Sequence, residues 1–84
     1  MTHALKTWPQ YMDALLSGAK TFELRKDDRP FDVEDILLLQ EYSPTRGYTG
    51  KEVKKIVTYI LRDAPGFGLK DGYCIIGIKD FATN

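Results

Sequence analysis

Side chains able to do chemistry are densest between residues 18 and 26 of this 84-residue chain. Lys20, Glu23 and Arg25 place an ammonium, a carboxylate and a guanidinium within six residues. Residues two apart in a strand share a face and lie about 7 Å apart, so Glu23 and Arg25 can pair or offer one ligand both an acceptor and a donor fork. Arginine suits phosphate or a guanine edge, and glutamate accepts from amines such as that of cytosine. The alternative is an exposed ion pair, worth about 0–1 kcal/mol.

The neighbouring basic residues extend this group or are ordinary solvated charges. In an ideal strand Lys20 lies on the opposite face, so it joins Glu23 and Arg25 only if the regular pleat begins after it. Lys6, Lys26 and Arg29 flank the segment and are candidates for a rim that contacts phosphate. A second basic group is more typical of a solvated hairpin, although phosphate contact is possible there: Arg46, Lys51, Lys54 and Lys55.

Other reactive or aromatic residues carry weaker signals. Trp8 is a candidate platform for a stacked base, but its helical spacing with other apolar residues favours core packing. Tyr59 and Tyr73 have the same two interpretations. Cys74 lies in an apolar run typical of a buried, inert thiol, and no partner for His3 is evident in the sequence.

The first element that must position these residues is a helix near residues 8–17. Apolar residues follow the spacing of one helical face: Trp8, Tyr11, Met12, Leu15 and Leu16. Thr7 and Gln10 fit a capping box, and Pro9 sits in the first turn, where it needs no N–H. Gly18 can take the left-handed conformation that ends a helix.

The rest of the chain predicts strands. Residues 20–26 alternate, with Phe22 and Leu24 on one side, and 36–42 begin as an apolar run typical of a strand covered on both faces. Further strands are predicted near 2–6, 52–61 and 73–79, with a long hairpin loop at 43–50 and a loop or short helical turn at 63–72. One helix among about five or six strands indicates an α+β fold. Such short strands tend to close into a barrel, which removes exposed edges, with the helix capping one end.

Composition narrows the class of protein. The length predicts one small domain over residues 1–84. One cysteine and one histidine argue against a disulfide framework, a multi-cysteine zinc site or a histidine-rich metal centre, so no metal or cofactor is expected. The net charge is zero, with −3 on residues 1–42 and +3 on 43–84. No apolar run or leader suggests a membrane segment, so a cytoplasmic protein is expected.

The motif Gly18-x-Lys20-x-x-Glu23-x-Arg25 after a helix resembles the G-x-K-x-x-E-x-R signature of ASCH domains, PUA-like domains named for homology to an activating signal cointegrator. The flanking segments 5–9, 25–29, 31–37, 48–50 and 57–60 also resemble small bacterial and phage members, so the likeness covers most of the chain. One departure is Glu34, where relatives usually carry the glycine of a Val-Gly-Asp turn.

The resemblance implies a PUA-like β-barrel with a cleft beside the helix, lined by Lys20, Glu23 and Arg25, which binds RNA or a nucleotide-like ligand. Some small bacterial members are amidohydrolases of N4-acetylcytidine that use a lysine, a threonine and a glutamate. The lysine matches Lys20, but their threonine falls at Glu23 here, with Thr21 two residues earlier, and their glutamate has no match.

The prediction is therefore an RNA- or nucleotide-binding module with Lys6, Lys20, Glu23, Arg25, Lys26 and Arg29 as ligand residues. The first alternative is an amidohydrolase that uses Lys20, Thr21 and Glu23, which requires Lys20 and Thr21 to meet in a narrow pocket. The second alternative is a protein-interaction module, whose sign is a large exposed apolar patch.

Overall fold

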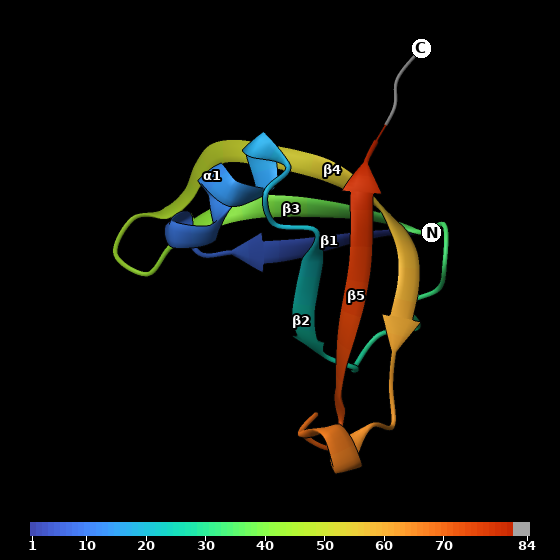
Figure 1. Ribbon diagram of the computed structural model, residues 1–84. Coiled ribbons are helices and arrows are strands. Elements are labelled where there is room, and N and C mark those ends of the chain that lie inside the picture. Colours follow the sequence, from blue (N-terminus) through green and yellow to red (C-terminus); the bar gives the residue numbers. More distant parts are fainter. Residues whose placement is uncertain (82–84) are drawn as a thin grey trace.

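The computed structural model describes residues 1–81. These residues form five strands, one α-helix and one turn of 3₁₀-helix (Figure 1). In chain order they are β1 (Thr2–Thr7), α1 (Pro9–Ser17), β2 (Phe22–Lys26), β3 (Ile36–Ser43), β4 (Gly47–Leu61), η1 (Pro65–Phe67) and β5 (Tyr73–Asp80). The α+β class and the five predicted strands are confirmed. Neither helix in residues 1–81 is long and apolar enough to cross a membrane.

The strands form one curled sheet in the order β1-β3-β4-β5-β2, with β1 parallel to β3 and the other neighbours antiparallel. The long strand β4 produces the curl: its first part pairs with β3, and its second part bends away to pair with β5 (Figure 1). Register shifts occur between Gln40 and Tyr42 in β3 and between Val57 and Tyr59 in β4. Such irregularities bend strands.

The sheet does not close, so the prediction of a closed barrel is wrong. The edge strands β1 and β2 share no ladder of backbone hydrogen bonds, and the result is a half-barrel. We call the gap between these two strands the seam. Since β2 has only five residues and β1 only six, both exposed edges are short, which limits edge-to-edge pairing with other chains.

Helix α1 begins and ends largely as its sequence predicts. Pro9 occupies the first turn, and Gly18 ends the helix in the left-handed region with φ of 84°. The predicted capping box is wrong, because Trp8 is the N-cap residue and no side chain caps it. Thr7 is instead the last residue of β1, and its hydroxyl lies 3.5 Å from Arg25.

The helix also buries a narrower face than its spacing predicts. Only Met12 and Leu15 are buried, whereas Trp8, Tyr11 and Leu16 are exposed. The core inside the curl takes Leu15 together with residues from β1, the β2–β3 connection, β3, β4 and β5: Leu5, Phe31, Leu37, Leu39, Val57, Cys74, Ile76 and Ile78. A half-barrel offers the helix only a short open end, so two helical turns cannot bury every apolar residue.

The β3–β4 hairpin is tighter than predicted. Ser43 pairs with Gly47, which leaves three residues in the turn in place of the expected loop over 43–50. Gly47 has φ of 77°, a conformation that glycine adopts without a steric cost. The strand pairing therefore continues almost to the turn and brings Tyr42 opposite Tyr48.

Candidate functional site

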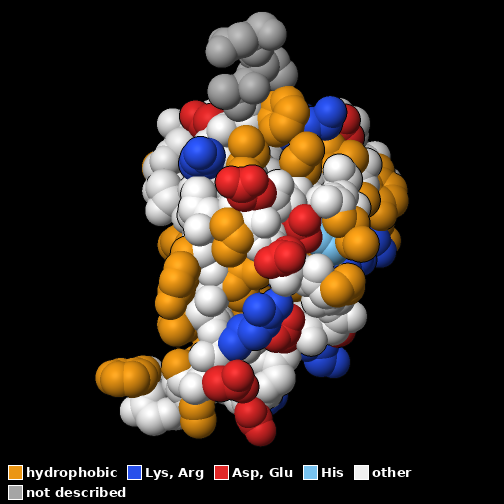
Figure 2. Space-filling view, turned by 90° about the vertical axis from the view of Figure 1, so that its right-hand side faces the viewer, with side chains coloured by type: hydrophobic (Ala, Val, Ile, Leu, Met, Phe, Trp, Pro, Cys, Tyr) orange, Lys and Arg blue, Asp and Glu red, His pale blue; other side chains and the backbone are white. Residues whose placement is uncertain are grey.

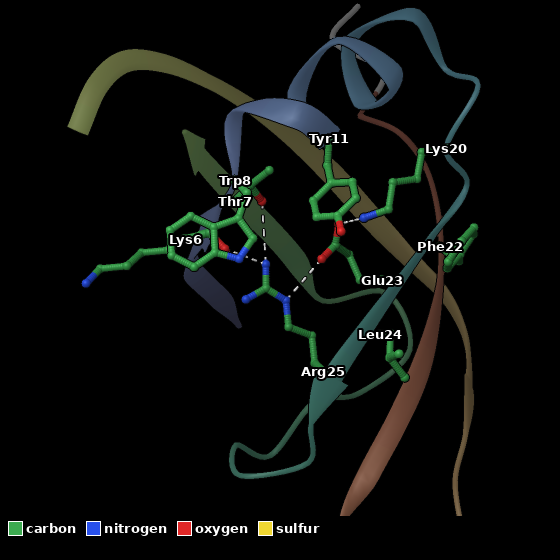
Figure 3. A pocket seen from close by; sticks show the side chains of 9 residues that line it. All are labelled: Lys6, Thr7, Trp8, Tyr11, Lys20, Phe22, Glu23, Leu24 and Arg25. Carbon is green, nitrogen blue, oxygen red and sulfur yellow. Dashed lines mark hydrogen bonds and ion pairs between the residues drawn. The ribbon is translucent and has the colours of Figure 1, made fainter. Parts of the chain in front are cut away.

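A pocket of about 380 Å³ opens where the seam meets α1 (Figure 3). It lies between the end of β1, the first turn of α1 and strand β2. Its walls combine charged, aromatic and apolar side chains: Lys6, Thr7, Trp8, Tyr11, Lys20, Phe22, Glu23, Leu24 and Arg25. The pocket brings together Lys6, Lys20, Glu23 and Arg25, four of the six residues predicted to bind a ligand.

Glu23 is the centre of this pocket. The residue is only 3% exposed, and its two carboxylate oxygens accept hydrogen bonds from different cations. Lys20 Nζ donates to Oε1 at 2.8 Å, and Arg25 Nε donates to Oε2 at 3.0 Å. Since β2 begins at Phe22, Lys20 precedes the regular pleat, and its side chain reaches the same side as Glu23. The condition stated for Lys20 is met.

The alternation in β2 is as predicted, but its apolar face is not the buried one. Glu23 pairs in the sheet with the buried Ile76, and Arg25 pairs with the buried Cys74, so both polar residues lie on the concave side. Phe22 and Leu24 are exposed on the other side. Period-2 alternation fixes which residues share a face, and the tertiary fold decides which face turns inward.

Two arginines bridge the seam. Arg25 Nη2 donates to the Lys6 carbonyl oxygen at 2.7 Å, and Arg29 Nη1 donates to the Ala4 carbonyl oxygen at 3.2 Å. These carbonyls are two residues apart on the edge strand β1, so the guanidinium groups take the place of the missing backbone ladder. Within residues 1–81, Arg25 Nη1 has no protein acceptor and can still donate to a ligand.

The other predicted ligand residues lie outside the pocket or at its margin. Arg29 lies on the seam and Lys26 is exposed on β2, and neither lines the pocket. Lys6 lines it, with Nζ 4.2 Å from the centre of the Tyr42 ring. Lys55 is not solvated as predicted: its side chain is 3% exposed and its amine donates to Asp80.

Aromatic rings from the start of α1 form one wall. Trp8 is 47% exposed, so the preference for core packing is wrong, and Tyr11 is exposed beside it. Figure 3 shows both rings above Glu23 and Arg25, which enter from β2. Lys20 Nζ lies 4.8 Å from the Tyr11 ring centre, a cation–π distance that helps hold the ammonium over the pocket.

The pair expected for a hydrolase does not form. Thr21 is exposed and does not line this pocket, and Lys20 donates to Glu23, with no hydrogen bond to Thr21 in residues 1–81. The threonine in the pocket is Thr7, which sequence reasoning assigned to a helix cap.

A second buried polar pair, which no local pattern predicts, forms between His3 and Asp35. His3 Nε2 lies 2.8 Å from Asp35 Oδ2, and both residues are buried. The hydrogen bond with His3 lowers the pKa of Asp35 below its ordinary value, although burial opposes this shift. The His3 ring also lies against Phe31, with 4.8 Å between ring centres. Neither His3 nor Asp35 lines the pocket.

Four exposed apolar side chains gather on the convex face of β2, β5 and β4: Phe22, Leu24, Tyr59 and Leu61. Phe22 and Tyr59 both pair with Gly77. Leu24 and Leu61 both pair with Ile75, so the four form two adjacent rows. Figure 2, viewed from the side of β4 and β5, shows hydrophobic side chains along one edge of the molecule. The interaction-module alternative requires a large exposed apolar patch, and these four side chains are a candidate for one.

Metal-ligating residues do not gather in the described part of the chain. In residues 1–81 no group of three His, Cys, Asp or Glu side chains is placed to hold a metal ion. Cys74 is fully buried, as predicted, and burial raises the pKa of its thiol.

Comparison with known proteins places the chain in a family. A protein of Escherichia phage P2, described as "Uncharacterized 12.9 kDa protein in GpA 3'region", is 37% identical over 57 residues, which are 67% of this chain and 50% of the relative. The chain thus spans about half the length of the curated relative it matches. The family model described as "Domain of unknown function (DUF3850)" matches residues 2–78. Because this match covers most of the sequence, the chain belongs to the DUF3850 family.

Proposed function

We propose that this domain binds a nucleotide, free or as an unpaired residue of RNA, in the pocket at the seam. The observation that carries the proposal is the buried Glu23 carboxylate held between Lys20 and Arg25 beneath exposed aromatic rings. The resemblance of this motif to the signature of ASCH domains supports the same ligand class.

The carboxylate of Glu23 reads the base. An ionised carboxylate offers about four lone-pair sites, and within residues 1–81 Lys20 and Arg25 use two of them. The remaining sites accept from the exocyclic amines of cytosine, adenine or guanine. Uracil has the O4 carbonyl oxygen in place of the exocyclic amine of cytosine, and this oxygen repels a carboxylate, so that only its single N3–H is left to donate. The pocket therefore prefers bases that carry an amino group.

The cations and rings hold the rest of the nucleotide. Lys6, Lys20 and Arg25 outnumber the single carboxylate in the pocket wall, so the local charge is positive although the chain is neutral. Arg25 Nη1 and the two lysine amines point to phosphate as their ligand. An exposed aromatic ring such as Trp8 stacks on a base with about 1–3 kcal/mol. Unpaired RNA is recognised by this combination of stacking and edge contacts.

The test is a titration of AMP, CMP, GMP, UMP and short single-stranded RNA, followed by the fluorescence of Trp8, the single tryptophan, which lines the pocket. We expect UMP to bind more weakly than the other three, and Lys20→Met to weaken all four. Glu23→Gln should reduce the difference between CMP and UMP, because an amide also donates to a carbonyl. Lys26→Met is the matched control: it removes an exposed lysine charge from strand β2, outside the pocket, and should change nothing.

Three results would overturn the proposal. Equal losses in Lys20→Met and Lys26→Met would show that only diffuse charge attracts the ligand. The absence of binding by every nucleotide would exclude this function. Acetate release from N4-acetylcytidine, lost in Lys20→Met, would replace binding by amide hydrolysis.

A further inference from the structure

A cluster of aromatic rings continues from the pocket onto the β3–β4 hairpin. Tyr42 and Tyr48 are cross-strand partners with ring centres 5.1 Å apart in an edge-to-face arrangement. Trp8 adds a third ring, 6.3 Å from Tyr42. Lys6 Nζ lies 4.2 Å from the centre of Tyr42 and 5.9 Å from that of Tyr48. We call these four residues the aromatic shelf.

Folding accounts for only part of this cluster. A cross-strand aromatic pair stabilises a hairpin, which explains the contact between Tyr42 and Tyr48. It does not explain why Tyr48 remains 57% exposed. Nor does it explain why Lys6 of β1 and Trp8, the residue that follows β1, join the pair. None of the shelf residues belongs to the buried core. The cluster thus presents stacking surface and a cation to solvent.

The shelf is continuous with the pocket. Trp8 and Lys6 belong to both, since they line the pocket and also contact the hairpin tyrosines. Tyr48 lies at the far end and does not line the pocket. A ligand that fills the pocket beside Trp8 and extends toward Tyr48 passes over Lys6. The order along this path is a base site, a cation and a second aromatic surface.

We propose that the aromatic shelf is a second base-stacking site, and that the ligand is therefore a single-stranded oligonucleotide and not a free mononucleotide. This inference rests on the proposed function of the pocket. One base occupies the pocket, the next stacks on the shelf, and the phosphate that joins them meets the Lys6 amine. Stacking on aromatic rings along a positively charged path is the usual means of binding single strands.

The experiment compares CMP with a cytidine pentanucleotide, and AMP with an adenosine pentanucleotide, at one salt concentration. The wild-type protein should bind each pentanucleotide more tightly than its mononucleotide. Tyr48→Ala should weaken pentanucleotide binding about 5- to 150-fold, the range for loss of one stacked base, and leave mononucleotide binding unchanged. Tyr48→Phe keeps the ring and should bind like the wild type.

The matched control is Tyr59→Ala. Tyr59 is a tyrosine on the same strand and is 65% exposed, but it lies on the convex face away from the pocket. Its removal should affect neither ligand. Amide NMR spectra of each variant establish that the fold is intact. If Tyr48→Ala does not fold, Tyr48→Phe provides the folded comparison.

The outcomes separate the two proposals. If the wild type binds neither mononucleotides nor pentanucleotides, the pocket function fails and the shelf fails with it. If the wild type binds both with equal affinity, or if Tyr48→Ala weakens neither, the shelf alone is refuted. Equal weakening of both ligands by Tyr48→Ala also refutes it, because the ring then acts through the pocket.

Discussion

The two cations beside Glu23 should be strongly coupled in their effect on stability. The Glu23 side chain is 4% exposed, and those of Lys20 and Arg25 are 17% and 22% exposed. Removing one cation as Lys20→Met or Arg25→Met leaves the carboxylate neutralised by the other. Each single change should therefore cost about 1 kcal/mol, the net value of one hydrogen bond. In Arg25→Met the Lys6 carbonyl oxygen loses its hydrogen-bond donor, but it lies on an exposed edge, where water donates in place of the guanidinium.

The double variant should cost more than the sum of the single ones. With both cations removed, a buried charge has no partner, a situation that costs about 3–5 kcal/mol. The expected coupling is therefore at least about 1 kcal/mol. Adding Glu23→Gln to the double variant removes the buried charge, so the triple variant should be more stable than the double one although it carries more substitutions.

Urea unfolding followed by Trp8 fluorescence and by far-UV circular dichroism measures these free energies. Coincident transitions from the two probes would establish two-state unfolding. The reasoning is refuted if the double variant equals the sum of the single variants within about 0.5 kcal/mol. It is also refuted if the triple variant is no more stable than the double one, because the carboxylate would then not be a buried charge that needs its partners.

Three further predictions concern residues outside the pocket. Glu34 has φ of 72°, in the left-handed region where a side chain has a steric cost. Glu34→Gly should therefore raise the free energy of unfolding by about 1 kcal/mol, whereas Glu34→Ala should not. Equal urea midpoints for the two variants would contradict this prediction. The lowered pKa of Asp35 means that its carboxylate adds to the free energy of unfolding at pH values above 3.8, the ordinary pKa. This stabilisation is lost as the pH falls below that value and the carboxylate is protonated. Asp35→Asn should thus cost about 2 kcal/mol at pH 6 and progressively less toward pH 3, and a difference that does not vary with pH would refute this account. Burial raises the pKa of Cys74, so a thiol reagent should label it only in urea; labelling of the native protein at a comparable rate would show that the core opens.

Local sequence patterns predicted the secondary structure because they act over a few residues. Pro9 and Gly18 mark the two ends of α1 as expected. Proline fixes φ near the helical value and glycine tolerates a positive φ, and both properties hold whatever surrounds the residue. The departure at Glu34 was also informative: relatives of the resembled family usually carry glycine there, and the structure holds this residue in the left-handed region. The turn is thus kept at a steric cost.

Long-range arrangement was not predictable from the same patterns. The expectation of a closed barrel failed because closure depends on whether β1 and β2 meet, and two arginines bridge them instead. The tight β3–β4 turn was missed because Ser43, Gly47 and Gly50 are typical of loops of any length. The burial of His3 depends on Asp35, a partner 32 residues away that no local pattern identifies.

Local patterns in the chain establish which residues share a face, where α1 lies and which ionisable side chains are close together along the chain. The packing of the strands against one another sets three further features: Glu23 and Arg25 turn inward, Trp8 stays at the surface, and Lys6 reaches Tyr42 and Tyr48. The physical reason is that side-chain periodicity is a property of each strand or helix alone. The inward face depends on how the whole sheet curls, and that is set by pairings between strands far apart in the chain.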